Sequence, residues 1–131
     1  MFRISVLTIF AMVVATSATA QAQTMGDCMR ALSRAAQKAK AFGSNTDEAR
    51  VSKDMLQAVA DAARQRTWSP LQKEIVSSYM QFANAFDGER KAIAEEVQAG
   101  RKPKSALASA TAKTAAFDAG VDAIDACGLS M

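Results

Sequence analysis

Two cysteines carry the clearest chemistry in this sequence. Cys28 and Cys127 are the only cysteines among its 131 residues, and they lie near the two ends of the segment that follows the first 20 residues. Cysteines of exported proteins form disulfides because their compartment is oxidising, and two cysteines allow a single intramolecular pairing. We therefore predict a Cys28–Cys127 disulfide, with a bridge between two chains as the alternative.

The chain contains no histidine, which removes several kinds of catalytic and metal chemistry. Ser-His-Asp and Cys-His catalysis need an imidazole base, most zinc sites use an imidazole ligand, and haem attachment uses Cys-x-x-Cys-His. Small exported four-helix cytochromes of the b-562 and c-prime kind are similar to the expected architecture in length and topology, but the resemblance stops there because their haem-ligand motifs are missing. The sequence therefore predicts a protein that is not an enzyme and has no catalytic, metal or cofactor-binding residues.

Weaker chemical candidates have simpler structural interpretations. Asp118, Asp122 and Asp125 share one helix face and could bind a hard cation, but Arg and Lys residues elsewhere can pair with them. Met29 could serve as an axial haem ligand, or with other methionines as a copper(I) site, yet core packing is the simpler interpretation. Trp68 and the phenylalanines could line an apolar pocket, and core packing again suffices.

The first 20 residues have the composition of a secretory signal peptide. A basic start at Arg3 precedes an apolar run over 4–15, and Ala18-Thr19-Ala20 fits the Ala-x-Ala cleavage rule. The run is shorter than the roughly 20 residues that span a bilayer. We predict cleavage before Gln21 and a periplasmic or secreted protein, with an uncleaved anchor as the alternative.

The remaining segment, 21–131, has the length of a single domain. The chain has 16 Lys and Arg residues, and loss of Arg3 leaves 15 against 13 Asp and Glu, a net charge of only +2. Neither this charge nor the expected compartment favours a nucleic-acid partner. We therefore predict one soluble domain without an integral membrane span after cleavage.

Hydrophobic periodicity predicts an all-α protein. Apolar residues recur at spacings of three and four, and no segment alternates with a period of two. The expected helices run from Met25 to Phe42, from about 45 to 67, from Pro70 to Gly100 and from about Pro103 to Ala126. Short turns between amphipathic helices favour antiparallel neighbours. The predicted fold is an antiparallel up-down-up-down four-helix bundle whose first and last helices are linked by the disulfide.

Helix ends are marked by residues with known capping preferences. Gly43 follows the first helix in the position that favours a left-handed residue, and Asn45 with Glu48 predicts a capping box for the second. Ser69-Pro70-Leu71-Gln72 combines a capping serine, a proline in the first helical position and a glutamine at the third. Gly88 is the weak point of the third helix, because glycine in a helix interior costs about 1 kcal/mol relative to alanine.

The predicted core stripes allow the helices to be aligned. They include Met25 and Met29 in the first helix and Leu71 in the third. Antiparallel residues at equal height have a constant sum of residue numbers, and the turns predict a sum of about 156 between the first and last helices. The residue numbers of Cys28 and Cys127 add up to 155, so the predicted disulfide agrees with this alignment to within one residue.

This alignment predicts two sets of contacts between helices. Charged residues on the first and last helices should face one another as Arg30 with Asp125, Arg34 with Asp122 and Lys38 with Asp118. Apolar residues on the third and fourth helices should stack as Phe86 with Phe117, Phe82 with Val121 and Tyr79 with Ile124.

The alignment also predicts an arm. About ten residues at the end of the third helix and ten at the start of the fourth extend past the other two helices by about 15 Å. Six residues form the candidate binding surface of this arm: Ile93, Val97, Arg101, Lys102, Lys104 and Leu107. In the alternative, the third helix breaks at Gly88 and the segment folds back as a cap.

A part-exposed apolar stripe with a basic tip favours binding to another macromolecule. We predict a non-enzymatic exported interaction protein, such as an inhibitor, an immunity protein or a chaperone-like module. The partner would be another protein, a second copy or a membrane surface. The alternative is a carrier of a small ligand or metal inside the bundle.

Overall fold

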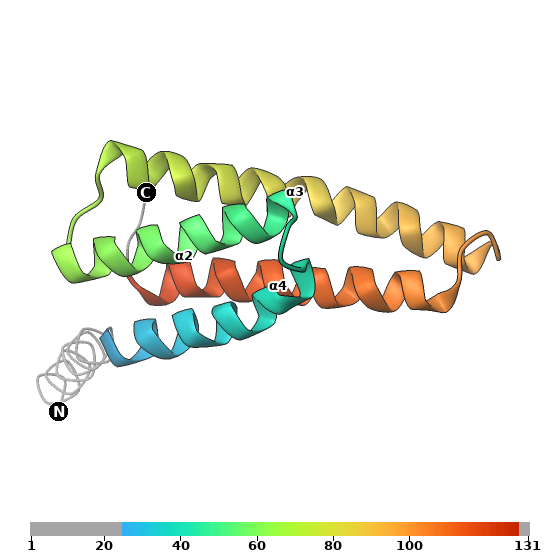
Figure 1. Cartoon of the computed structure of the whole chain (residues 1–131), viewed down its shortest axis with the longest axis horizontal. Helices are drawn as coiled ribbons and strands as arrows, with labels where there is room; N and C mark the ends of the chain where they lie inside the picture. Colours follow the sequence, from blue (N-terminus) through green and yellow to red (C-terminus); the bar gives the residue numbers. More distant parts are fainter. Residues whose placement is uncertain (1–24, 129–131) are drawn as a thin grey trace, which may run out of the picture.

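The chain folds into an all-α antiparallel bundle in the computed structural model, which describes residues 25–128 (Figure 1). An N-terminal helix over 25–38 continues into the 3-10 turn η1 (Ala39–Phe42), and three α-helices follow: α2 (Asp47–Gln65), α3 (Pro70–Gln98) and α4 (Lys104–Ala126). The predicted fold class is confirmed. The predicted signal peptide, residues 1–20, lies outside the described residues.

The beginning of α3 matches the sequence prediction. The Ser69 hydroxyl accepts a hydrogen bond from the Gln72 amide at 3.1 Å, and the Gln72 side-chain oxygen accepts one from the Ser69 amide at 2.8 Å. Pro70 follows the cap in the first turn, where no intrahelical donor is needed. These residues form the predicted capping box, so both the start of α3 and its cause were readable from the sequence.

The predicted cap of α2 is wrong by one residue. Thr46, rather than Asn45, caps the helix, and its hydroxyl accepts a hydrogen bond from the Ala49 amide at 3.1 Å. The same hydroxyl donates to the carbonyl of Phe42 at 2.7 Å. One side chain therefore links the end of η1 to the start of α2, and this local contact favours Thr46 over the neighbouring Asn45 as the cap.

Two glycines test the predicted helix ends. Gly43 does not adopt the predicted conformation, and Gly88 does not interrupt its helix. Gly43 has a positive φ of 83° but a ψ of −165°, so it is not in the left-handed helical region. The turn before Gly43, η1, has 3-10 rather than α-helical geometry, so the chain continues from the end of this helix in a different direction. Gly88 lies inside α3, which is continuous from Pro70 to Gln98. The cap alternative, which needed a break at Gly88, is therefore wrong.

The core is centred on the ring of Phe117 in α4. Its ring centroid lies 4.7 Å from that of Phe42, 5.6 Å from Tyr79 and 5.5 Å from Phe86, all in tilted arrangements. Tilted aromatic pairs at such distances contribute about 0.5–1.5 kcal/mol beyond area burial. The predicted Phe86–Phe117 contact is confirmed, and this aromatic layer joins η1, α3 and α4.

Gly120 allows α4 to approach Tyr79 closely. A Cβ atom at Gly120 would lie 2.0 Å from the Tyr79 hydroxyl oxygen and 2.9 Å from Cε of Met55. The Tyr79 hydroxyl donates toward the carbonyls of Ala116 at 3.3 Å and Phe117 at 3.1 Å. Glycine is required here because a side chain would occupy the space of the tyrosine.

The predicted disulfide between Cys28 and Cys127 is confirmed. The S–S distance is 2.07 Å and the two Cα atoms lie 4.4 Å apart. Both cysteines are buried with Leu32. The bridge thus holds the N-terminal helix against the end of α4.

Three residues of the predicted core stripes lie at the surface instead. Met25, Met29 and Leu71 are 46%, 55% and 65% exposed. In the N-terminal helix the disulfide turns Cys28 toward the core, and Leu32 follows it four residues later. Met29 is rotated by about 100° from Cys28 along an α-helix, which carries it out of the core. Leu71 lies in the first turn of α3, next to the bundle end.

The predicted charge pairs between the first and last helices do not form ion pairs in the described part of the chain. Arg30 pairs with Asp27 one turn away. Asp118, Asp122 and Asp125 are exposed. Exposed ion pairs contribute about 0–1 kcal/mol, so packing of buried residues determines the helix orientation and leaves these charges in solvent.

Candidate functional site

The pair α3–α4 extends past the other helices as an arm, which we define as residues 90–112. Figure 1 shows the end of α3 and the start of α4 continuing beyond the turn between η1 and α2. The Cys28–Cys127 bridge and the Phe86–Phe117 contact fix the helix heights. By these heights the turn lies level with about residue 90 of α3 and 112 of α4, which leaves an arm of about 15 Å.

The tip of the arm is a compact, basic turn. Gly100 has a φ of 75°, and the amides of Arg101 and Lys102 both donate to the carbonyl of Glu96, at 2.9 and 3.2 Å. The side-chain Nε of Arg101 also donates to the Glu96 carboxylate at 2.8 Å. These bonds satisfy the Glu96 carbonyl at the end of α3 and pair the Arg101 side chain with the Glu96 carboxylate.

The six predicted binding residues all lie on the arm. Arg101, Lys102 and Lys104 are exposed at the tip. The apolar residues Ile93, Val97 and Leu107 are half-buried, because α3 and α4 pack against each other along the arm. Part of each apolar side chain remains exposed to solvent.

A cluster of charges lies at the base of the arm. Asp87 accepts from Arg90 at 3.2 Å and lies 3.4 Å from the ammonium group of Lys91. The hydrogen bond from Arg90, followed by that from Lys91, lowers the pKa of the Asp87 carboxyl below its ordinary value. The Asp87 carboxylate therefore stays ionised to a lower pH than an ordinary aspartate does.

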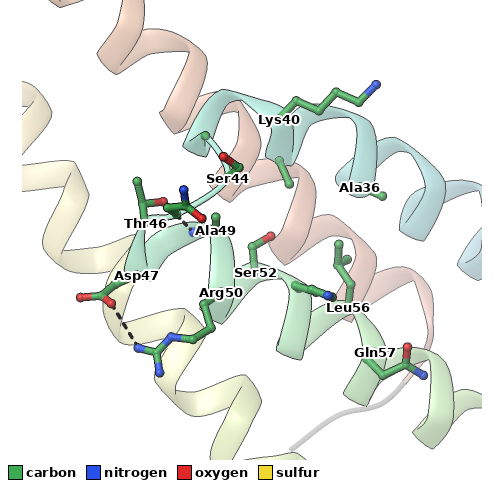
Figure 2. Close-up of a pocket in the computed structure, with 14 residues that line it drawn as sticks. Ala36, Lys40, Ser44, Thr46, Asp47, Ala49, Arg50, Ser52, Leu56 and Gln57 are labelled. Carbon is green, nitrogen blue, oxygen red and sulfur yellow. Dashed lines mark hydrogen bonds and ion pairs between the residues drawn. The ribbon is translucent and has the colours of Figure 1, made fainter.

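A groove that the sequence did not predict lies between the N-terminal helix and α2. Figure 2 shows Ala36 and Lys40 on one side and Ser52 and Leu56 on the other. The cavity has a volume of about 850 Å³ and is open to solvent. Its signal in the sequence is the set of small residues that line it: Ala36, Ala39, Gly43, Ser44, Ala49 and Ser52.

Charges in this groove are partly neutralised. Arg50 pairs with Asp47 at 3.2 Å, while Lys40 and Lys53 line the groove as further cations. A smaller cavity of about 330 Å³ lies between α3 and α4, where Asp87 and Asp118 are among the lining residues. Among residues 25–128, no three His, Cys, Asp or Glu side chains come together as a metal-binding group.

Comparisons with protein families, with curated proteins and with solved structures found no match. Within residues 25–128, no helix has the length and apolarity needed to cross a bilayer. The disulfide is compatible with an exported protein.

Proposed function

We propose that this chain is an exported, non-enzymatic protein that binds another protein through the α3–α4 arm. The observation that carries the proposal is the arm itself, where two packed helices continue without the N-terminal helix and α2 beside them (Figure 1). Inhibitors, immunity proteins and chaperones act by presenting such surfaces. The export part of the proposal is supported by the signal-like first 20 residues and the disulfide.

The chemistry of the arm favours a partner with an apolar patch and acidic residues at its edge. Val97 and Leu107 offer part-exposed apolar surface, and the exposed cations of the tip lie next to it. Protein interfaces combine an apolar centre with a polar rim in this way. The basic rim would speed association with an acidic partner and make it dependent on salt.

The carrier alternative would need space for a ligand inside the bundle. The centre of the described bundle is filled by Tyr79, Met55 and Val59, each of which has essentially no exposed surface. This packing supports an interaction surface on the outside over a binding site on the inside.

Charge reversal at the tip tests the proposal. We expect the triple variant Arg101→Glu, Lys102→Glu, Lys104→Glu to lose partner capture in a pull-down from an extract of the source cells, followed by titration of the identified partner. The helical signal should stay close to wild type and the loss of stability should stay near or below about 1 kcal/mol, because the three side chains are exposed and the Arg101–Glu96 pair that is lost is a surface ion pair. Leu107→Asp should also lose capture by placing a charge in the apolar surface.

A matched control uses the groove cations. The triple variant Lys40→Glu, Arg50→Glu, Lys53→Glu changes the net charge by the same amount at a distant surface. This control variant should still capture the partner, with a dissociation constant within about threefold of the wild-type value. Equal loss of capture in both triple variants would show that net charge alone governs binding, and would contradict a specific arm.

A further inference from the structure

We propose that the groove between the N-terminal helix and α2 binds a small organic anion, a carboxylate joined to an alkyl chain. This site is separate from the arm and does not depend on the function proposed for the arm. The groove has a volume of about 850 Å³, within the roughly 300–1,000 Å³ of small-ligand sites. Its lining combines a buried hydroxyl, cations and small apolar side chains (Figure 2). Each kind matches one part of such a ligand.

Ser52 points most directly to a ligand. It is 2% exposed and is the only serine, threonine, amide or charged residue that is buried in the described chain. Figure 2 shows its side chain between Ala49 and Leu56, on the face of α2 turned toward the N-terminal helix. Hydroxyls in α4 donate to the carbonyl four residues earlier, as Thr114 does to Ala110 at 2.9 Å, but the Ser52 hydroxyl forms no hydrogen bond with a described residue. Because the groove is open, this hydroxyl can donate to an oxygen of a bound carboxylate.

The charges along the groove favour an anion. Three cations and one acid are among the lining residues: Lys40, Arg50, Lys53 and Asp47. Arg50 and Asp47 pair with each other at 3.2 Å, whereas neither lysine is in an ion pair with a described residue. The Lys40 side chain extends into solvent in Figure 2, and its flexible stem allows the ammonium group to turn toward a bound anion. The two lysines and the Ser52 hydroxyl suit a carboxylate, which accepts hydrogen bonds at two oxygens.

The rest of the lining favours an alkyl chain. Ala36, Ala39, Ala49 and Leu56 line the groove from both helices, and none of its lining residues is aromatic. Flat ring ligands gain most from aromatic partners, so this lining suits a flexible aliphatic body instead. The open groove covers only one side of such a chain. We therefore expect a dissociation constant of about 0.1–1 mM for a ligand of about ten non-hydrogen atoms.

Titration of the purified chain with octanoate, followed by the NMR chemical shifts of its backbone amides, tests this site. We expect saturable shifts that are concentrated in residues 36–57. The probe 1-octanol has the same chain length without the charge, and acetate has the charge without the chain. Each should bind at least about tenfold more weakly than octanoate. Octyl phosphate that bound more tightly than octanoate would overturn the assignment of a carboxylate.

Two variants test the shape and the hydroxyl of the groove. Ser52→Ala should weaken octanoate binding at least about tenfold, because a hydrogen bond to a charged group is lost. The fold should be retained, since alanine favours a helix. Its matched control, Ser77→Ala at an exposed position of α3, should leave the affinity unchanged. Ala36→Leu should also weaken binding by filling the groove, and leucine is a good helix former at this exposed position.

A charge variant tests the selection of an anion. The double variant Lys40→Met, Lys53→Met should weaken octanoate binding at least about tenfold and leave the affinity for 1-octanol nearly unchanged, since methionine keeps an apolar stem of similar length. The double variant Lys91→Met, Lys102→Met makes the same change of net charge on the arm. It should retain octanoate binding within about twofold.

Four results would overturn the site. They are an absence of saturable shifts at ten times the expected dissociation constant, equal binding of octanoate and 1-octanol, an affinity unchanged in both Ser52→Ala and Ala36→Leu, or shifts centred on residues 90–112 instead of the groove. None of them would affect the proposed function, because partner capture by the arm is measured without octanoate.

Discussion

Tyr79 is the residue on which the packing of α3 against α4 depends most directly. Its side chain is fully buried, and its hydroxyl lies against the backbone of α4. Burial, and secondarily the negative charge of Asp118, raises the pKa of the Tyr79 phenol well above its ordinary value. The folded chain therefore holds this group neutral under conditions in which an unfolded chain would ionise it.

This shift predicts a loss of stability in alkaline solution. Because the folded pKa exceeds the unfolded value of about 10, the stabilisation is complete below pH 10 and falls as the pH rises toward the folded value, by up to about 1.4 kcal/mol per pH unit. Tyr79→Phe should lose this dependence, at a cost near neutral pH of about 0.5–1.5 kcal/mol for the lost hydrogen bonds. Urea unfolding of both proteins between pH 8 and 11 measures the difference.

The tyrosine also provides its own optical check. Tyr79 is the only tyrosine in the sequence, so tyrosinate absorbance reports on this residue alone. We expect the absorbance to appear together with loss of the helical signal. Ionisation near pH 10 in a folded chain, or equal pH dependence of the wild type and Tyr79→Phe, would contradict the buried hydroxyl.

Single residues show where sequence reasoning reaches its limit. The Phe86–Phe117 contact was predictable because both residues lie on strong apolar stripes at equal height. The apolar stripe alone places Met29 in the core, because the helix containing it has apolar residues on two faces. The predicted disulfide needs Cys28 on the buried face, and this requirement places Met29 outside the core. Thr46 and Asn45 are equally good caps by type, and the choice depends on the position of the Phe42 carbonyl.

At the scale of the elements, the two glycines inside α3 and α4 have opposite roles. Apart from its chain neighbours and the backbone of its own helix, Gly88 has no atom within 4 Å of the position its Cβ would occupy, whereas Gly120 is in contact with Tyr79 and Met55. In the sequence Gly120 lies three residues after Phe117 and four before Ile124, on the apolar stripe of its helix, whereas Gly88 stands between Asp87 and Glu89. How closely Tyr79 and Met55 approach Gly120 is seen only once α4 packs on the other helices.

Alanine at each glycine tests this distinction. Gly88→Ala should stabilise the chain by up to about 1 kcal/mol, because alanine restricts the unfolded backbone and suits a helix. Gly120→Ala should destabilise it by about 1–3 kcal/mol or more, because the methyl group overlaps the Tyr79 ring and forces the core to shift. Urea or thermal unfolding measures both. Each variant controls for the other, and a similar effect of both would show that α4 does not approach Tyr79 closely.

At the scale of the whole molecule, the order and overlap of the helices were largely predictable. Short turns set the antiparallel order, and the two cysteines confirm the height of the first helix relative to the last. The arm follows from these heights and from the length of α3. The groove beside α2 was not predictable, because it depends on how far apart two helices with small side chains settle.

The Cys28–Cys127 bridge controls the stability of this whole arrangement. The cysteines are 99 residues apart, so the bridge closes nearly the entire described chain into one loop. Loop-closure entropy for about 100 residues gives up to about 4.7 kcal/mol, and removal of a native disulfide from a small exported domain costs about 2–5 kcal/mol. A domain of this size has a net stability of about 5–15 kcal/mol, so the bridge contributes a large part.

The double variant Cys28→Ala, Cys127→Ala should therefore lose about 2–5 kcal/mol in urea unfolding, while its residual helical signal shows whether the bundle still forms. Alanine is preferred to serine because serine would leave buried hydroxyl groups without partners at the two positions. The loss of stability then reports mainly on the crosslink. Reductant should lower the stability of the wild type toward that of the variant and leave the variant unchanged. Equal stability of the two proteins without reductant would mean that packing of the N-terminal helix on α4, rather than the covalent link, holds the ends of the chain together.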